Sequence, residues 1–268
     1  MKATLLIIDP QVDFHTGSLA VPGANEDADR IANLIRNNMA QIERLVITLD
    51  THHKLHIAHG GFWESGSGDS SQPQPFSIIQ KSDVDDNVWL PRNRSLIPHV
   101  LDYIGKLEAS GKFKLCIWPE HCIVGSYGHC VVPPIFEAAN EWSFQHNKSI
   151  EYVRKGENNL TEMYSALAAE VPLDSDPSTQ MNTKMKDRLL PKQAGQRLIV
   201  CGQALSHCVN YTTRDLVEGV EDKEVLHRIF LLENCASAVP KCEEDAAQFV
   251  KDMRSMEIHV CDAAEAFA

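Results

Sequence analysis

Short apolar runs alternate with longer amphipathic segments along the chain, and this alternation limits the folds that the chain can adopt. The apolar runs predict buried strands at residues 4–8, 45–49, 113–118, 150–153, 198–201, 229–232 and 258–260. The intervening segments predict helices at residues 25–43, 95–109, 134–146, 162–169, 180–190, 206–219 and 241–256. Strands that alternate with helices form a parallel sheet covered on both faces. We therefore predict a three-layer α/β/α fold with a mostly parallel, doubly wound, Rossmann-like sheet.

Residues 60–98 interrupt this alternation, because they are rich in Gly, Ser, Pro, Gln and Asp. A connection of this length inside a compact domain is usually functional or mobile. The rest of the 268 residues shows no internal repeat and no linker composition. The sequence thus predicts a single domain over residues 1–268, with an insertion at about residues 60–113.

Charge and cysteine spacing exclude several classes of function. The chain has 25 Lys and Arg against 37 Asp and Glu, a net charge of −12, which argues against nucleic acid and anionic membranes as partners. No apolar run is long enough to span a bilayer, and the N-terminal residues lack the cleavage site of a signal peptide. The eight Cys form no CxxC pair, which is atypical of a zinc ribbon or a secreted disulfide framework. We therefore expect a cytoplasmic protein.

The segment LIVCGQALSHCVNYTT, residues 198–213, places Cys208 at the start of a predicted helix. A strand, a tight turn and a residue at a helix N-terminus form the arrangement of a nucleophile elbow. The helix dipole and free backbone N–H groups are expected to lower the pKa of the Cys208 thiol. A single cysteine is nevertheless more often a buried structural residue than a nucleophile. Its role therefore depends on the groups that the fold brings to it.

Two charged residues, Asp9 and Lys155, lie at or just past the ends of predicted strands, as Cys208 does. Ligands of parallel sheets bind beyond the carboxyl ends of the strands. Asp9 could accept the thiol proton, and Lys155 would favour both the carboxylate and the thiolate. Taken singly, such an Asp is usually a turn residue and such a Lys a solvated charge. The three together predict a nucleophilic centre.

A second group of polar residues follows the predicted strand at residues 45–49. Asp50 ends this strand, and His52 points the same way as Asp50 if the strand continues. His56 and, far along the chain, His121 add two further imidazoles. Histidine and carboxylate ligands suit Zn²⁺, Fe²⁺ or Mn²⁺. Other histidines lie in the same stretch, so the spacing alone leaves both a metal site and an incidental cluster open.

Five motifs together make the chain similar to the isochorismatase-like cysteine hydrolases, and within them to the nicotinamidases. The motifs are IIDPQVDF at residues 7–14, DTHHKLH at residues 50–56, WPEHC at residues 118–122, VRKG at residues 153–156 and GQALSHCV at residues 202–209. Each is weak by itself, but their combination and order are specific. The resemblance extends over the chain apart from residues 60–113.

The resemblance implies catalytic roles for the matched residues. Asp9 corresponds to the acid and base, Lys155 to the catalytic lysine and Cys208 to the nucleophile. The backbone N–H groups of Ala204 and Cys208 correspond to the oxyanion hole. The family also has a non-proline cis peptide in this turn, which corresponds to Gln203–Ala204.

The resemblance also implies a metal site and an aromatic pocket. Its metal ligands correspond to Asp50, His52, His56 and His121, with zinc favoured over iron or manganese. The pocket residues correspond to Phe14, Trp118 and Tyr164. In nicotinamidases the metal binds the pyridine nitrogen and positions the ring.

The expected activity is therefore hydrolysis of nicotinamide or a related heteroaromatic amide to the acid and ammonia through a thioester, by a homo-oligomer. The chain departs from the family pattern at Leu205-Ser206, at Ala58-His59 and above all in the long segment 60–113. That segment would cover the site as a lid, a specificity element or a subunit interface. Two alternatives stay open: a cysteine amidase acting on another small amide or carbamoyl compound, and a non-catalytic small-molecule binding protein. Isochorismatase activity is disfavoured, because vinyl-ether hydrolysis does not use the nucleophilic cysteine.

Overall fold

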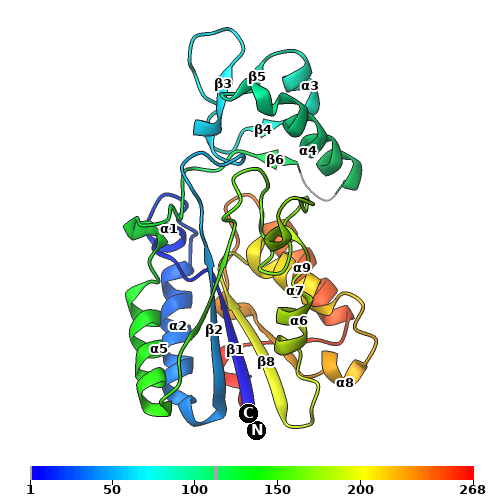
Figure 1. Cartoon of the computed structure of the whole chain (residues 1–268). Helices are drawn as coiled ribbons and strands as arrows, with labels where there is room; N and C mark the ends of the chain where they lie inside the picture. Colours follow the sequence, from blue (N-terminus) through cyan, green and yellow to red (C-terminus); the bar gives the residue numbers. More distant parts are fainter. Residues whose placement is uncertain (1, 112–113) are drawn as a thin grey trace.

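The computed structural model describes residues 2–111 and 114–268. Its centre is a six-stranded sheet with the order β10-β9-β8-β1-β2-β7, in which each neighbouring pair is parallel (Figure 1). The strands are β1 (Lys2–Ile8), β2 (Ile42–Asp50), β7 (Glu151–Lys155), β8 (Gln196–Gly202), β9 (Ile229–Leu232) and β10 (His259–Cys261). This order confirms the predicted doubly wound sheet.

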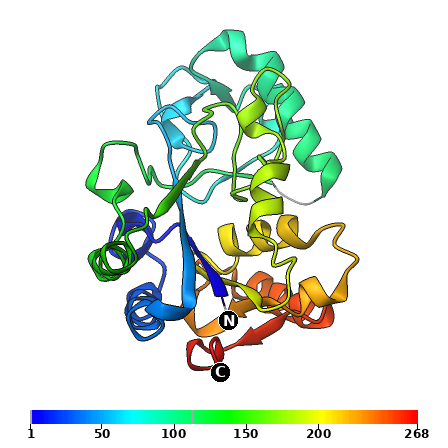
Figure 2. The same ribbon diagram turned by 60° about the horizontal axis from the view of Figure 1, so that its bottom comes forward.

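Helices cover both faces of the sheet (Figures 1 and 2). One face carries α2 (Ala24–Asn37) and α5 (Pro133–His146), and the other carries α6 (Thr183–Leu189), α7 (Cys208–Val217) and α9 (Glu243–Ser255). The short helices α1 (Val12–His15) and α8 (Lys223–Leu226) lie in connections. Successive β1 side chains alternate between the faces, so that Leu5 and Ile7 enter one core while Leu6 and Ile8 enter the other. The three-layer prediction is therefore confirmed.

The segment 60–111 lies beyond the carboxyl ends of the central strands (Figure 1). It contains β3 (Trp63–Ser65), β4 (Ile78–Ile79), α3 (Lys81–Asp85), β5 (Trp89–Pro91) and α4 (Ile97–Ser110). β3 pairs with β5, and β4 pairs with β6 (Leu115–Cys116), both in antiparallel orientation. Tyr103 and Ile104 of α4 belong to the same hydrophobic core as Trp118. The assignment of one domain with an insertion stays a prediction.

Several element boundaries differ from the sequence prediction. The helix predicted at 25–43 ends at Asn37, because β2 already begins at Ile42. The strand predicted at 113–118 is reduced to β6, which pairs outside the central sheet, and Phe113 lies outside the described residues. No helix among residues 2–111 and 114–268 is both long and apolar enough to cross a membrane.

The helix predicted at residues 162–169 does not form. Side-chain oxygens take the backbone N–H groups that a helix would use. Ala166 N–H donates to the Thr212 hydroxyl and Leu167 N–H to the Ser165 hydroxyl, both at 3.0 Å. The prediction was therefore wrong because side chains, including Thr212 from 46 positions along the chain, accept from N–H groups that the helix would use.

The chain changes direction across the sheet between β1 and β8, where parallel sheets bind their ligands. Gly202 ends β8 with φ of 114°, and a Cβ added there would lie 2.1 Å from the carbonyl oxygen of Ile8. Only glycine permits this approach of the two strands. The turn after β8 is thus held directly beside Asp9, the residue that follows β1.

Candidate active site

The ends of three strands bring the predicted catalytic residues together. Asp9 follows β1, Lys155 ends β7, and Cys208 begins α7 after the turn that follows β8. The Lys155 ammonium lies 3.0 Å from Asp9 Oδ2 and 3.5 Å from Cys208 Sγ. All three side chains are buried. The fold therefore assembles the thiol, the carboxylate and the ammonium into one cluster.

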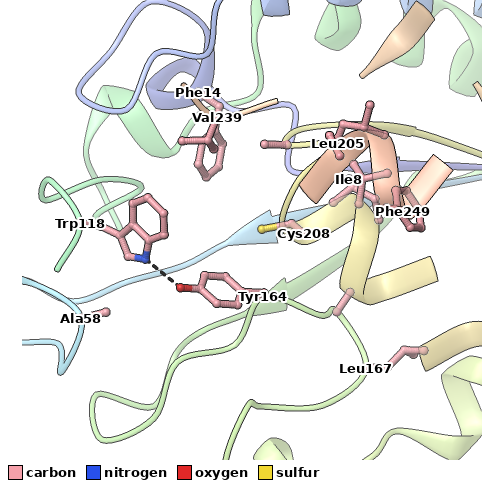
Figure 3. Close-up of a cluster of buried hydrophobic side chains, with 14 of the residues drawn as sticks. Ile8, Phe14, Ala58, Trp118, Tyr164, Leu167, Leu205, Cys208, Val239 and Phe249 are labelled. Atoms are coloured by element: carbon pink, nitrogen blue, oxygen red, sulfur yellow. Dashed lines mark hydrogen bonds between the residues drawn. The ribbon is translucent and has the colours of Figure 1, made fainter. Parts of the chain in front are cut away.

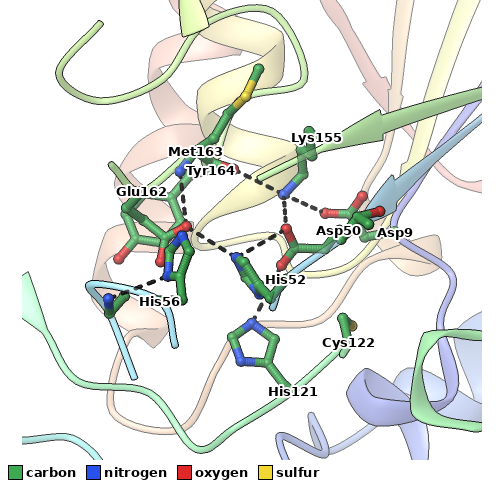
Figure 4. A network of polar contacts seen from close by, with 12 residues as sticks. Asp9, Asp50, His52, His56, His121, Cys122, Lys155, Glu162, Met163 and Tyr164 are labelled. Atoms are coloured by element: carbon green, nitrogen blue, oxygen red, sulfur yellow. Dashed lines mark hydrogen bonds and ion pairs between the residues drawn. The ribbon is translucent and has the colours of Figure 1, made fainter. Parts of the chain in front are cut away.

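Lys155 has a second carboxylate partner, Asp50, which the motifs assign to a metal site. Its Nζ donates to Asp50 Oδ1 at 2.9 Å and to the carbonyl oxygen of Met163 at 3.0 Å (Figure 4). Although burial acts to lower it, the charges of Asp50 and Asp9 raise the pKa of Lys155 well above its usual value. Lys155 is therefore a stable cation between two buried carboxylates.

Burial raises the pKa of Asp9, and the neighbouring Lys155 charge opposes this only in part. Burial likewise raises the pKa of the Cys208 thiol well above its usual value, again against the effect of Lys155. The expectation of a lowered thiol pKa is therefore wrong for the free protein, because desolvation outweighs the helix N-terminus and the cation. The cluster presents a neutral thiol beside a carboxyl group with raised proton affinity.

Asp9 is held by Thr48, a residue of the neighbouring strand β2 that the motifs do not include. The Thr48 hydroxyl donates to Asp9 Oδ1 at 2.5 Å and accepts from the Asp9 backbone N–H at 3.0 Å. Asp9 has φ of 42°, which turns the chain sharply after β1. Thr48 therefore fixes the carboxylate at this turn. Because this contact joins residues 39 positions apart, local sequence pattern carries no signal for it.

The turn before Cys208 contains the predicted cis peptide, Gln203–Ala204. Gln203 Nε2 donates to the buried carboxylate of Asp27 at 2.8 Å, and the Ser237 hydroxyl donates to the same Oδ2 atom at 2.6 Å. Among the residues that the structure describes, no group accepts a hydrogen bond from the backbone N–H of Ala204 or of Cys208. These two donors are thus available to a bound oxygen atom next to the Cys208 sulfur.

An aromatic pocket opens onto Cys208 (Figure 3). Phe14, Trp118 and Tyr164 line it together with Ala204, so the predicted pocket residues lie around one space. Trp118 Nε1 donates to the Tyr164 hydroxyl at 3.0 Å, which joins two of the walls. Apolar walls with a few polar groups at one end are typical of sites for flat aromatic molecules.

His207 and Glu162 also line this pocket, although no role was predicted for them. The His207 ring stands edge-on to Trp118 at 5.2 Å and to Tyr164 at 5.3 Å between centroids. Burial lowers the pKa of His207 to about 4, so its ring is neutral at pH 7. Its place directly before Cys208 in the nucleophile motif was the available sequence signal.

Buried histidines gather at the other end of the pocket, close to Asp50 (Figure 4). Two overlapping groups have ligand atoms within 4.8 Å of one another: His52, His59 and His121, and His52, His56 and Glu162. Asp50 Oδ2 lies 3.3 Å from His121 Nε2, and Asp50 Oδ1 lies 3.5 Å from His52 Nε2. The structure therefore brings the four predicted ligands together and adds His59 and Glu162.

The two loop histidines, His56 and His59, differ in whether their ring nitrogens are already used. His56 Nε2 lies 3.2 Å from the carbonyl oxygen of Thr161, and its Nδ1 accepts from the Ala58 N–H at 3.2 Å. Both ring nitrogens of His59, and Nδ1 of His52, are buried without a partner among the described residues, whereas His52 Nε2 lies 3.5 Å from carboxylate oxygens of Asp50 and Glu162. Buried polar atoms of this kind are expected to have a partner. His52 and His59 therefore fit a metal ion better than His56 does.

Comparison with known proteins gives two sequence relatives. The chain is 26% identical to a nicotinamidase of Escherichia coli over 216 residues, which are 80% of this chain and 76% of the relative. It is 25% identical to a nicotinamidase of Saccharomyces cerevisiae over 217 residues, which are 80% of this chain and 81% of the relative. No family model matches the chain.

Solved structures with the same fold cover almost the whole chain. Yeast nicotinamidase matches with a TM-score of 0.63 and 21% identity over 97% of this chain and 99% of that one. A pyrazinamidase of Pyrococcus horikoshii in complex with zinc matches with a TM-score of 0.54 and 18% identity over 98% and 99%. An isochorismatase family protein of Desulfovibrio vulgaris matches with a TM-score of 0.50 and 16% identity over 98% and 95%. At these identities the structural matches establish the fold.

The sheet order and these structural matches establish the isochorismatase-like fold for this chain. In sequence the chain is nicotinamidase-like, since both of these relatives are nicotinamidases.

Proposed function

We propose that the chain hydrolyses nicotinamide or a related heteroaromatic amide to the acid and ammonia through a thioester on Cys208. The observation that carries this proposal is the buried cluster of Cys208, Lys155 and Asp9 at the end of an aromatic pocket. The nicotinamidase relatives support it. Yeast nicotinamidase binds the inhibitor nicotinaldehyde, which has the same pyridine ring as nicotinamide.

In the first half of the reaction, Cys208 Sγ bonds to the amide carbonyl carbon while Asp9 accepts the thiol proton. Asp9 then gives this proton to the amide nitrogen, the C–N bond breaks, and ammonia leaves. In the second half, water attacks the thioester carbon and gives a proton to Asp9. Asp9 returns it to the Cys208 sulfur as the acid leaves. A carboxyl group with a raised pKa suits this repeated transfer.

The negative oxygen of each tetrahedral intermediate would lie against the backbone N–H groups of Ala204 and Cys208. Donors that are fixed before the reaction stabilise such a charge without reorganisation. Lys155 would hold Asp9 in place and favour the thiolate that forms when the proton leaves Cys208.

We further propose that Asp50, His52, His59 and His121 hold a divalent metal ion, with zinc favoured and iron or manganese as alternatives. Both nitrogens of His59 and Nδ1 of His52, which have no partner among the described residues, and the carboxylate of Asp50 support this set. His59 takes the place that the sequence prediction gave to His56. When bound, the ion would hold the ring nitrogen of the substrate and so orient its carboxamide group.

The metal content of single variants should show which of the two loop histidines, His56 or His59, is a metal ligand. His59→Ala should lower metal affinity by at least about tenfold, whereas His56→Ala should retain more metal, because His56 bonds to the backbone instead. The measurement is metal per chain by mass spectrometry after dialysis, with the exposed His53→Ala as the control. Full metal retention in His59→Ala, together with loss in His56→Ala, would restore the original assignment.

Ammonia release over a panel of amides tests the substrate class. We expect kcat/KM for pyridine and pyrazine carboxamides to exceed that for benzamide by at least about tenfold, since benzamide lacks the ring nitrogen. Turnover of aliphatic amides or carbamoyl compounds alone would favour the other amidase. Tight binding of pyridine carboxamides without ammonia release would favour a non-catalytic binding protein.

Three broader expectations stand beside this proposal: a cytoplasmic location, a homo-oligomeric state and a single domain with an insertion. The acidic net charge of −12 supports the absence of nucleic-acid and membrane partners. The substrate class itself, a small-molecule amide, is supported by the aromatic lining of the pocket beside Cys208.

A further inference from the structure

A turn at Gln74-Pro75-Phe76-Ser77 places an aromatic side chain at a position that normally favours glycine. The Ser77 N–H donates to the carbonyl oxygen of Gln74 at 3.0 Å, and Phe76 has φ of 68°. Proline at the second position and positive φ at the third are features of a type II turn, in which Gly or Asn usually stands third. A bulky residue with positive φ is an outlier. The turn alone therefore gives no reason for phenylalanine.

Burial does not explain Phe76 either, because the residue is 56% exposed. Its ring instead packs edge-on against Trp118, with 5.9 Å between centroids and an interplanar angle of 84°. The Phe76 N–H donates to the carbonyl oxygen of Ile117, and the Ile117 N–H donates to that of Ser77 at 2.8 Å. The turn is thus bonded to the residue before Trp118, while its side chain contacts Trp118 itself.

Trp118 connects this contact to the pocket. Its indole donates to the Tyr164 hydroxyl at 3.0 Å and meets the His207 ring at 5.2 Å. Phe76 supplies a further ring contact, from the segment 60–111. Edge-on aromatic pairs favour particular ring orientations, so removal of Phe76 would take away one of the contacts that hold the Trp118 ring in its orientation.

We propose that Phe76 is a positioning residue, which fixes the Trp118 indole and thereby sets the shape of the aromatic pocket. The proposal rests on the proposed function of this pocket as the amide site. The segment 60–111 would then contribute to substrate binding through Trp118.

Phe76→Gly is the decisive variant, because glycine adopts φ near 68° without strain. If the role of Phe76 were merely structural, Phe76→Gly would lower Tm. If Phe76 is a positioning residue, Tm should stay the same or rise. KM for nicotinamide should increase about three- to tenfold, with kcat changed by less than about twofold. Phe76→Tyr keeps the ring and should restore KM. Val88→Ala, at an exposed apolar residue of the same segment, is the control and should leave KM unchanged.

Trp118 fluorescence provides a readout that does not need turnover. The Trp118 emission of each variant is the difference between its spectrum and the spectrum of the same variant that also carries Trp118→Phe. This emission should change in Phe76→Gly but not in Phe76→Tyr or Val88→Ala. Unchanged Trp118 emission in Phe76→Gly, or unchanged KM where nicotinamide is turned over, would overturn the positioning role. Changed emission in a protein that hydrolyses no amide would overturn the amidase proposal alone.

Discussion

Cys208→Ala should abolish amide hydrolysis while the protein stays folded. Without the sulfur no thioester forms, so kcat should fall by at least about 10³-fold. Alanine fills most of the small buried space, and the pocket should still bind nicotinamide. Ammonia release and calorimetric binding to the variant measure the two effects. Cys130→Ala, at an exposed free cysteine, is the matched control and should retain full activity.

The state of the Cys208 thiol can be followed by alkylation. Because burial raises its pKa well above the usual value, iodoacetamide should label it slowly at pH 7 and faster as the pH rises, by about tenfold per unit. Peptide mass spectrometry gives the rate at Cys208 relative to Cys130. Rapid labelling of Cys208 at neutral pH would contradict the raised pKa of its thiol. More than about a tenth of wild-type activity in Cys208→Ala would contradict the proposed thioester mechanism.

Lys155→Met should cause a large loss of both stability and activity. The substitution leaves Asp9 and Asp50 buried without the cation that lies 3.0 and 2.9 Å from them. Removal of one partner from a buried ion pair costs about 3–5 kcal/mol in the free energy of unfolding. Urea unfolding at pH 7 measures the cost. Lys192→Met removes an exposed ion pair with Asp187 and should change stability by less than about 0.5 kcal/mol.

The stability deficit of Lys155→Met should depend on pH in a defined direction. Burial already raises the pKa of Asp9, and loss of the opposing Lys155 charge would raise it further. A carboxyl group with a raised pKa binds its proton more tightly in the folded chain, so its contribution to stability is present at low pH and lost as the pH rises through the folded pKa. The deficit should therefore shrink on acidification. A deficit below about 1 kcal/mol at pH 7 would show that Asp9 and Asp50 need no counterion.

The layered fold was predictable because the periodicity of apolar residues reports burial directly. The runs around Leu5 and Ile199 read as buried strands, and both strands lie in the middle of the sheet. Elements whose form depends on distant partners were not predictable in this way. The segment at 162–169 looks helical from its composition, yet its N–H groups bond to side chains such as Thr212, far away in the sequence.

The polar residues of the candidate site show the same difference between features that depend on position within an element and features that depend on distant contacts. Asp9, Lys155 and Cys208 were identifiable because each falls at a strand end or helix start. Whether His56 or His59 is the metal ligand stays a proposal, because it depends on which ring nitrogens the backbone already uses, and the sequence does not show this. The predicted direction of the Cys208 pKa was wrong, because desolvation depends on everything packed around the sulfur.

One carboxylate contacts both the cluster around Cys208 and the histidine cluster. Asp50 meets Lys155 through Oδ1 and His121 through Oδ2, at 2.9 and 3.3 Å. A change in the charge or position of one Asp50 oxygen therefore alters the interactions of the other oxygen. Thermodynamic linkage makes this effect reciprocal for equilibrium binding: if a metal ion in the histidine cluster changes the proton affinity of the Cys208, Asp9 and Lys155 cluster, then protonation of that cluster must change metal affinity by the same factor. Metal binding and proton binding are thus coupled equilibria of one site.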